Sequence, residues 1–588
     1  MTVDVAAWIL IALVAGLLIV HRNLVRALWF RTEDPRPVAL FRIATGALVL
    51  AWLVDLAPLY DYLFTPQGLV DGPEAHRRWG RMGPVSPLYV RDDSAFVHAY
   101  LGALGISAAA LMVGFCTPVS AWLTWGLFVG LLGRNGVFTG GEQIFTCFLF
   151  YLSLSRCGHA FSVDAWLHRR RGGQPRTIPA WPRNLMLLQM LGVLCANGFA
   201  KYGRSWQQGD TLHFVLNHPH FRAFEAYGIS ALLGTTALRW MTWITHAFEI
   251  LFFLVLVGVV VKLVRSHPVE PPRGRARWLG RALGVAIGMD IVVLANLRLT
   301  DSARASMSWS FAIALGVVIA LGPVVLRVAR RLPPVVLRWA LGRRVWVSLW
   351  LLFTAQLVFV LRIGWFTALT MCAAVLMFEG EELARALARI GIPFGSTPTE
   401  VPRPPRPWRR RFIGALCAFH VVAAVALCLP AERPVSPWRK DLERPLRRWI
   451  RQTNYAQVWR MFAPSGSIRV LDFEAVMRDD SGQVLPLGAG IVAPEHLASR
   501  WGLDKREKIR RRLGSPKIGP NYWPAHARWV CRQFGARVDG PSVVELYRTL
   551  TPIPTPRALQ TLGVEQAVAQ AEASRERILV FSETCSPN

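Results

Sequence analysis

The chain has 588 residues, of which 53% are hydrophobic and 24 are tryptophan, and its formal net charge is +30. A composition this apolar excludes an ordinary soluble domain. Strong positive charge can indicate nucleic-acid binding, but here the basic residues cluster between long apolar segments rather than on polar surfaces. We therefore expect membrane topology to explain the charge, and we expect no nucleic-acid partner.

Long apolar segments recur along the first 430 residues. About 20 mostly apolar residues are needed to cross the hydrocarbon core, and a helix satisfies its own backbone there. We predict an all-α polytopic membrane domain of about 10–12 transmembrane helices, some of them short enough to be re-entrant. The candidate segments are residues 6–20, 38–57, 98–115, 118–133, 143–155, 184–202, 240–263, 282–298, 308–328, 345–361, 364–378 and 412–429.

Arginine and lysine cluster in alternate connections between these segments. Because short cytoplasmic loops carry an excess of both residue types, we expect the amino terminus and everything after Pro430 to lie outside the cytoplasm. The first apolar segment lacks a basic leader and a small-residue cleavage site, so we expect an uncleaved anchor. These features predict a multi-pass protein of a bacterial inner membrane. The basic connections are residues 22–31, 169–176, 262–277, 327–344 and 406–411.

The chain changes character after residue 430. RVLDFEAVMRDDSGQVLPL alternates in the manner of two strands joined by a turn at DDSG. VVELYRTL predicts another strand, EHLASRWGLDKREKIRRRL a basic helix, and TPRALQTLGVEQAVAQAEASRERI a second helix after Pro556. We divide the chain into an anchor with a basic loop (1–34), a multi-helix membrane domain (35–430) and a small soluble extracytoplasmic α+β domain (431–588).

The cysteines carry little information about chemistry. Of the nine, only Cys531 and Cys585 lie in the soluble domain, and they could form one disulfide if that domain is outside the cytoplasm. The others lie in or beside apolar segments, where cysteine behaves as a small hydrophobic residue. Since no clustered Cys/His pattern is present, we expect no metal site.

Several polar residues interrupt the apolar segments, where a charge at mid-bilayer costs about 2.5–3.5 kcal/mol. Asp290 and His420 lie mid-segment, and His246 and Glu249 are three residues apart, on one helical face. For these four residues we expect interhelical hydrogen bonds or pairing with a buried arginine, in preference to contacts with a substrate.

Other charged residues lie near the ends of segments. Arg42 and Asp55 are placed where their side chains can reach the interface. Lys201 closes the segment 184–202, and a lysine in such a place usually extends to the lipid headgroups.

Three motifs occur in order: LFRIATGALVLAWLVDLAPLYDYLFTPQGLVDG at 40–72, GGEQIFTCFLFYLSLSRCGHAFSVDAWL at 140–167 and NGFAKYGRSWQQGDTLHFVL at 197–216. With the paired patterns SVD-x-x-L and K-x-x-x-x-W, they resemble the horizontally transferred transmembrane (HTTM) family, which includes the vitamin K-dependent gamma-glutamyl carboxylases. The resemblance covers roughly residues 35–380. YAQVWRMFAP at 455–464 is similar to a tail segment of bacterial members.

The resemblance implies two catalytic residues. Lys201, five residues before Trp206, stands where the carboxylases have the lysine that deprotonates vitamin K hydroquinone. His159, three residues before Ser162, stands where they have a histidine associated with the carboxylation step. An amine is a base only when it is neutral, and the exclusion of water at an apolar helix end favours that form.

The resemblance also implies the cofactor and the substrates of the reaction. A reduced menaquinone or vitamin K-type hydroquinone would arrive from the membrane lipids, with O₂ and CO₂ as co-substrates. The oxygenated quinone would remove the gamma proton of a glutamate-containing peptide, CO₂ would capture the carbanion, and the quinone would leave as an epoxide. On this basis the protein would be a carboxylase of the carbon–carbon lyase class.

The chain departs from the carboxylases in two places. They have two adjacent lysines where this chain has Ala200 and Lys201, and residues 431–588 show no pattern typical of propeptide binding. The loop charges also place His159 and Lys201 at opposite ends of one segment, about a bilayer apart. Either 184–202 is not a simple crossing, or the loop after His159 folds in, or the two residues do not share a site.

Two classes of function follow from the sequence. The first is a quinol- and oxygen-dependent carboxylase or epoxidase-like enzyme with a lysine base. The alternative is a nonenzymatic membrane scaffold or lipid-binding protein that displays the carboxy-terminal domain. A transporter would use Asp290 and Glu249, but the sequence has no detectable inverted repeat of the kind many transporters show.

Overall fold

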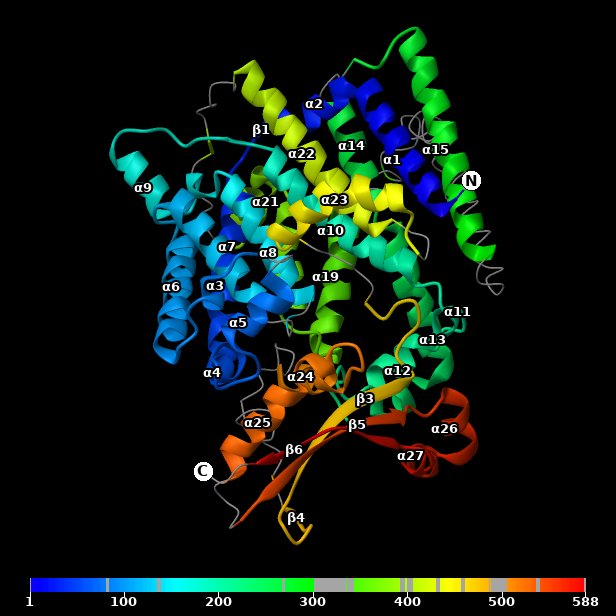
Figure 1. Ribbon diagram of the computed structural model, residues 1–588. Helices are drawn as coiled ribbons and strands as arrows, with labels where there is room; N and C mark the ends of the chain where they lie inside the picture. The colour runs from blue at the N-terminus through cyan, green and yellow to red at the C-terminus, as the bar shows by residue number, and fades with distance from the viewer. Residues whose placement is uncertain are drawn as a thin grey trace.

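A bundle of helices lies over a small curled sheet in the computed structural model of the chain (Figure 1). The amino-terminal helix lies at one side of the bundle, and the sheet is formed by the carboxy-terminal part of the chain. The structure describes residues 2–80, 84–134, 138, 140–266, 270–300, 335, 343–391, 397–398, 406–429, 434–455, 461–485, 487, 505–535 and 540–585.

The described part of the bundle consists of long apolar helices and short connecting ones. The first half contains α1 (Val3–Val20), α2 (Arg22–Phe30), α3 (Arg36–Leu56), α4 (Tyr60–Phe64), α5 (Gly72–Ala75), α6 (Ser94–Val113), α7 (Thr117–Gly133), α8 (Gly140–Leu154), α9 (Val163–Arg170) and α10 (Trp181–Ala200). The second half contains α11 (Arg204–Gln207), α12 (Thr211–Asn217), α13 (Gly228–Leu251), α14 (Leu254–Ser266), α15 (Arg275–Thr300), α19 (Arg343–Val360), α20 (Trp365–Ala373), α21 (Gly380–Ala388), α22 (Pro407–Cys428) and α23 (Pro437–Gln452).

Each predicted apolar segment contains a helix where the structure describes it, and segment 308–328 lies outside the described residues. This confirms an all-α membrane domain, while the expected number of about 10–12 crossings stays a prediction. Among the described residues, the helical stretches long and apolar enough to cross a membrane are Val3–Val20, Arg36–Phe64, Ser94–Val113 and Gly228–Val260. Shorter apolar helices cover Thr117–Gly133, Val345–Val360 and Trp365–Met377.

Helix α3 lies at the centre of the bundle, packed against α6, α8 and α20. Its aromatic side chains form the core: the Phe41 ring meets Phe148 edge-on at 4.9 Å between centroids, and Trp52 packs against Phe128 at 5.0 Å. Phe41 and Trp52 are fully buried. Because aromatic pairs bury large areas, this cluster holds α3, α7 and α8 together.

Helix α23 packs on the bundle, although the sequence assigned it to the soluble domain. Arg439 in α23 donates to Asp4 of α1 at 2.8 Å and to Glu443 at 2.7 Å, and all three side chains are buried. Trp449 in the same helix donates its indole N–H to Nδ1 of His420 in α22. These buried polar contacts hold α1, α22 and α23 together, so the sheet-containing region begins after α23.

A short antiparallel ribbon closes the opposite end of the bundle from the sheet. Strand β1 (Thr32–Glu33) pairs with β2 (Ile178–Pro179), and Asn184 at the start of α10 donates to the Leu28 carbonyl of α2 at 2.7 Å. This ribbon fixes the amino-terminal end of α10 against α2.

The carboxy-terminal region contains a four-stranded antiparallel sheet with the strand order β4-β3-β5-β6. Helices α24 and α25 lie between this sheet and the bundle, and α26 and α27 lie at one end of it (Figure 1). The elements are β3 (Arg469–Arg478), β4 (Val484–Leu485), α24 (Lys505–Gly514), α25 (Trp523–Phe534), β5 (Ser542–Pro552), α26 (Pro556–Leu562), α27 (Val564–Ala573) and β6 (Glu576–Cys585).

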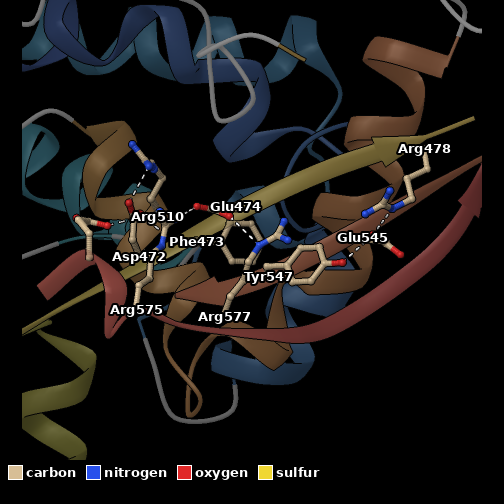
Figure 2. Close-up of polar contacts among 10 residues, drawn as sticks. Asp472, Phe473, Glu474, Arg478, Arg510, Glu545, Tyr547, Arg575 and Arg577 are labelled. Atoms are coloured by element: carbon tan, nitrogen blue, oxygen red, sulfur yellow. Dashed lines mark hydrogen bonds and ion pairs between the residues drawn. The ribbon is translucent and has the colours of Figure 1, made fainter. Parts of the chain in front are cut away.

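The two faces of the sheet differ in character. Along β3 the apolar Phe473 and Met477 are buried and alternate with charged residues, as the two-residue period of a strand requires. Figure 2 shows that the charged residues of the strands pair with one another, with Arg510 of α24 and with Arg575 before β6. Its contacts are Arg510 with Asp472 (2.7 Å), Arg577 with Glu474 (3.2 Å), Arg575 with Glu474, Arg478 with Glu545 (2.8 Å), Tyr547 Oη with Glu545 (2.8 Å), and Arg577 over the Tyr547 ring (3.7 Å).

The structure confirms the α+β class of this region and corrects its details. The two strands about DDSG and the strand VVELYRTL are present as β3, β4 and β5. The predicted helix after Pro556 is divided at Gly563, whose φ of +79° is unfavourable for other residues, and its last residues belong to β6. Strand β6 and helix α25 were not predicted, and residues 495–504 of the predicted basic helix lie outside the described residues.

The sheet region is fastened to the bundle by hydrogen bonds between buried groups. Tyr62 Oη of α4 lies 2.9 Å from Nδ1 of His526 in α25. His213 Nε2 in α12 donates to the Pro554 carbonyl at 2.9 Å, and His220 Nε2 donates to the Leu471 carbonyl at 3.1 Å. Since buried polar groups must be satisfied, these bonds fix the orientation of the sheet on the bundle.

Candidate functional site

Lys201 lies at the carboxy-terminal end of α10, where the helix stops. Its φ of −87° and ψ of +60° leave the helical region, and its N–H donates to the Gly198 carbonyl. The side chain is only 3% exposed, so Lys201 does not extend to the lipid headgroups. The expectation for a lysine taken alone is therefore wrong at this position.

The ammonium group of Lys201 is paired with a carboxylate from the neighbouring helix. Its Nζ lies 2.6 Å from Oε1 and 2.5 Å from Oε2 of Glu249 in α13. Glu249 is 2% exposed and also accepts a hydrogen bond at 3.1 Å from Nδ2 of Asn197, one turn before Lys201 in α10. The pair is thus enclosed between two packed helices, and Glu249 has the expected interhelical hydrogen bonds, although its cation is a lysine and not the expected arginine.

Two further groups complete the surroundings of the ammonium. The ring of Trp206 lies 4.2 Å from Nζ, which is a cation–π distance. Asn197 Oδ1 is buried, and among the described residues it has no hydrogen-bond partner. A buried acceptor without a partner is rare, so this atom is a place where a hydroxyl donor fits.

A carboxy-terminal segment covers this cluster. The N–H of Gly203 donates to the Pro464 carbonyl at 2.7 Å, and Nε1 of Trp206 donates to the Phe462 carbonyl at 2.7 Å. A Cβ on Gly203 would lie 2.0 Å from Ser465 Oγ, so only glycine permits this approach. The described part of the motif YAQVWRMFAP therefore packs directly on the motif NGFAKYGRSW.

His159 lies in a different part of the molecule. It ends the short 3₁₀ turn Cys157–His159 after α8 and hydrogen-bonds to the backbone of Thr177, just before β2. Burial, reinforced by the positive charge of the nearby Arg156, lowers the pKa of His159 to about 4, so the imidazole is neutral at physiological pH.

Arg42 organises the loop that carries His159. The guanidinium is fully buried and donates to the carbonyls of Cys157 at 2.9 Å, Ala160 at 3.3 Å and Phe161. Arg42 was expected to reach the interface, and that expectation is wrong. The loop carbonyls cannot all be satisfied within the turn, and a guanidinium offers several donors at once.

The SVD pattern has a structural explanation. Ser162 accepts from the N–H of Ala165 at 2.9 Å and caps α9. Asp164 accepts from the N–H groups of Cys116 and Thr117, at 2.9 and 2.7 Å, which places its carboxylate at the amino-terminal end of α7. These contacts join two helix starts, since unpaired N–H groups there attract a carboxylate.

The structure does not bring His159 and Lys201 together. Helix α10 is continuous, with the ribbon that contacts His159 at its start and Lys201 at its end. Twenty residues at 1.5 Å each separate the two ends by about 30 Å. Of the explanations left open by the sequence, the geometry supports the one in which the two residues do not share a site.

Most of the other polar residues have internal partners. His246 Nε2 donates to the Gly198 carbonyl at 3.0 Å, and His420 bonds to Tyr151 and Trp449. Asp55 accepts from Nε1 of Trp365 at 3.0 Å and is buried, contrary to the expectation that it reaches the interface. Asp290 is buried, and its Oδ2 has no hydrogen-bond partner among the described residues.

Sequence reasoning missed one member of the Lys201 cluster, Asn197, and one contact within it, the pairing of Lys201 with Glu249. Asn197 is four residues before Lys201, so both lie on one helical face, and this spacing was the available signal. The pairing of Lys201 with Glu249 gave no comparable signal, because the residues are 48 positions apart and only tertiary packing joins them.

The comparisons with known proteins give one match. Residues 30–267 match the family model of the HTTM domain, which ends before the limit of about residue 380 expected from the sequence motifs. No curated protein and no solved structure matches the chain significantly. The matched range contains both Lys201 and His159, and the resemblance to the gamma-carboxylases is consistent with this family. The chain is therefore a membrane protein whose residues 30–267 are similar to the HTTM domain.

Proposed function

We propose that the protein is a quinol- and oxygen-dependent membrane enzyme of the gamma-carboxylase type, with Lys201 as the base and Glu249 as its proton partner. The observation that carries this proposal is the enclosed Lys201–Glu249 pair at the end of α10. Two charges removed from water are costly, and a protein keeps ionisable groups inside a membrane mainly for function.

The pair can supply a neutral amine without releasing a proton to bulk water. Transfer of one proton from the Lys201 ammonium to the Glu249 carboxylate, over 2.5–2.6 Å, leaves an amine and a carboxylic acid and changes no net charge. Where water is excluded, moving the proton from Lys201 to Glu249 costs less free energy than losing it from the site, because the loss would leave the Glu249 carboxylate charged without a partner. Lys201 can then accept a proton from an acidic hydroxyl, and the ammonium that results stabilises the oxyanion.

The residues present fit the hydroxyl group of a quinol. Asn197 Oδ1 is a buried acceptor without a described partner, four residues from the base, and the Trp206 ring offers an aromatic surface beside Nζ. Asn197 and Lys201 would hold the hydroxyl, and Glu249 would keep both side chains in place. A bound hydroquinone would supply the acidic hydroxyl and, with O₂, the strong base that carboxylation of a glutamate-containing peptide with CO₂ needs.

His159 cannot assist Lys201 in the same step, because about 30 Å separates them. The proposal therefore assigns proton exchange at Lys201 to Glu249. For His159 a role in a separate step stays a prediction of the family resemblance, and the neutral imidazole is in the form that such a role needs.

The proposed location is a bacterial inner membrane with the sheet region outside the cytoplasm. The disulfide between Cys531 of α25 and Cys585 of β6 supports this orientation, because disulfides persist in oxidising compartments. The amino terminus lies on the same side as α23, since Asp4 contacts Arg439. The positions of the basic connections agree with this side.

Oxygen uptake tests the enzyme proposal directly. The purified protein in lipid discs receives a menaquinol-type hydroquinone, and O₂ consumption and epoxide formation are followed together. We expect uptake that depends on the hydroquinone and is absent with the matching dimethyl ether, which has no acidic hydroxyl. No uptake with any of a series of quinols would overturn the proposal.

The second candidate is a nonenzymatic scaffold that presents the sheet region at the membrane surface. The observation in its favour is that Lys201 is 3% exposed and already paired, as a purely structural ion pair would be. The bonds from Tyr62, His213 and His220 hold the sheet region as a fixed body. This candidate predicts no quinol turnover and full biological activity for a variant in which the pair is replaced by apolar residues.

A further inference from the structure

An apolar groove opens at the end of the bundle away from the sheet. Leu187, Leu188 and Leu191 of α10 form one wall, and Val255 and Leu256 of α14 form the other. Trp29 of α2 lies at its mouth. Leu256 is 41% exposed, so the groove communicates with the surroundings of the helices, which in a membrane are the lipid acyl chains.

The polar groups at the closed end of the groove are engaged within the protein. Arg183 contacts Glu33 at 2.9 Å and donates to the Phe378 carbonyl at 2.9 Å. Glu379 forms a capping box with Glu382 at the start of α21. Arg31 and Arg183 outnumber Glu379 among the charged residues that line the groove, so its lining does not repel an anionic molecule.

Exposed arginines lie on α2, which carries Leu28 and Trp29 of the groove lining, and at the start of α22. Arg22 and Arg26 are four residues apart on α2, so they lie on one face of that helix. Arg410 at the start of α22 lies over the Phe30 ring at 4.7 Å, next to Trp29. Arg409 and Arg411 are exposed beside it. Exposed basic side chains therefore lie on α2, which lines the groove, and at the start of α22, which contacts α2 through Phe30.

We propose that this groove is a binding site for one anionic phospholipid. An acyl chain lies between α10 and α14, and the phosphate group lies against Arg22, Arg26 and Arg410. Charge complementarity selects this occupant: basic clusters beside a membrane helix attract anionic lipids, at about 1 kcal/mol per basic residue near the surface. A zwitterionic lipid gains the same apolar contact but no net charge attraction, and a neutral quinol gains nothing from the arginines. The site is independent of the proposed enzyme activity.

The inference is tested by lipid binding to the purified, delipidated protein. Phosphatidylglycerol and phosphatidylcholine with identical acyl chains are titrated, and bound lipid is counted by native mass spectrometry. We expect one phosphatidylglycerol per chain to bind at least tenfold more tightly than phosphatidylcholine. Arg22→Gln with Arg26→Gln should remove most of this preference while leaving the weaker, chain-dependent binding.

Filling the groove should remove the site. Leu256→Trp is expected to lower the affinity for phosphatidylglycerol at least tenfold, whereas Ile106→Trp, on the exposed surface of α6, should leave it unchanged. Leu188→Phe is a smaller change that serves if Leu256→Trp does not fold. Equal stoichiometry and affinity for both lipids, or equal effects of Leu256→Trp and Ile106→Trp, would show annular lipid only and overturn the proposal. Equal competition by palmitate would overturn the assignment of the headgroup.

Discussion

Lys201 and Glu249, from α10 and α13, meet with Nζ 2.6 and 2.5 Å from the two carboxylate oxygens, and both side chains are at most 3% exposed. A lone lysine would have to lose its proton by desolvation alone. Beside Glu249, the proton has a defined acceptor, and the neutral amine arises by exchange within the pair. The chemistry expected of Lys201 therefore depends on a residue that the sequence motif does not contain.

Gly203 packs so closely against the segment after Phe462 that we expect no larger residue to fit at this position. Gly203→Ala should shift the covering segment, because a Cβ there lies 2.0 Å from Ser465 Oγ and 2.5 Å from the Pro464 carbonyl. We expect a loss of about 1–3 kcal/mol in the free energy of unfolding and faster proteolysis near residue 462.

Gly192→Ala is the matched control for that change. A Cβ at Gly192, on an exposed position of α10, meets nothing within 4 Å, and alanine favours the helix by about 0.5–1 kcal/mol. It should leave the thermal midpoint unchanged or raise it. Equal melting and equal proteolysis of the two variants would contradict the close packing of the covering segment.

The contact of Tyr62 with His526 predicts a dependence on pH. Burial lowers the pKa of His526 from its ordinary value of 6.5 to about 3, so the folded protein binds fewer protons than the unfolded chain between these values. The contribution of His526 is complete above pH 6.5 and is lost as the pH falls from 6.5 toward 3, with a slope of at most about 1.4 kcal/mol per pH unit. Unfolding of the sheet region in denaturant, followed between pH 7 and pH 4.5, measures this slope.

The control for the pH prediction is His526→Gln, which keeps a polar side chain and removes the titration. Its stability should be lower at pH 7 and should fall less steeply below pH 6.5. If the two stability curves run parallel over this range, His526 does not stay neutral in the folded protein.

The fold could be predicted from the sequence where local patterns decide it. Apolar length predicts the helices, and strand alternation predicts β3 and β5. Residues joined by tertiary packing could not be found in this way: Arg42 satisfies carbonyls about 115 residues away, and β6 is visible only as a partner of β5. For the site, the motifs identify Lys201, while Glu249 and the covering segment come from packing alone.

The Arg439 cluster predicts a large loss of stability from one substitution. Arg439→Met would remove the cation that pairs with buried Asp4 and would leave Glu443 with Arg447 alone, and such a loss typically costs about 3–5 kcal/mol. Thermal unfolding in detergent should show a strong decrease in the midpoint and release of α1. Arg444→Met, which removes an exposed pair with Asp441, is the comparison and should change little. Equal effects of the two substitutions would mean that the buried cluster does not hold α1.

The disulfide between Cys531 and Cys585 joins α25 to β6, across 54 residues of sequence. Its removal by Cys531→Ser with Cys585→Ser should lower the free energy of unfolding of the sheet region by about 2–5 kcal/mol. Peptide mapping without reduction should recover the linked peptides from protein exported to the outer side of the membrane. A fully reduced pair in such protein would contradict both the bond and the proposed orientation.

The most direct measurement of the central claim compares hydroquinone conversion by wild type, Lys201→Met, Glu249→Gln and Lys440→Met in lipid discs. Lys440 is an exposed lysine on α23 and serves as the control. For each variant, thermal unfolding and size-exclusion profiles establish that the chain is folded. We predict that Lys201→Met abolishes epoxide formation, that Glu249→Gln lowers it at least 100-fold, and that Lys440→Met leaves it unchanged. Conversion by folded Lys201→Met at the wild-type rate would contradict the account.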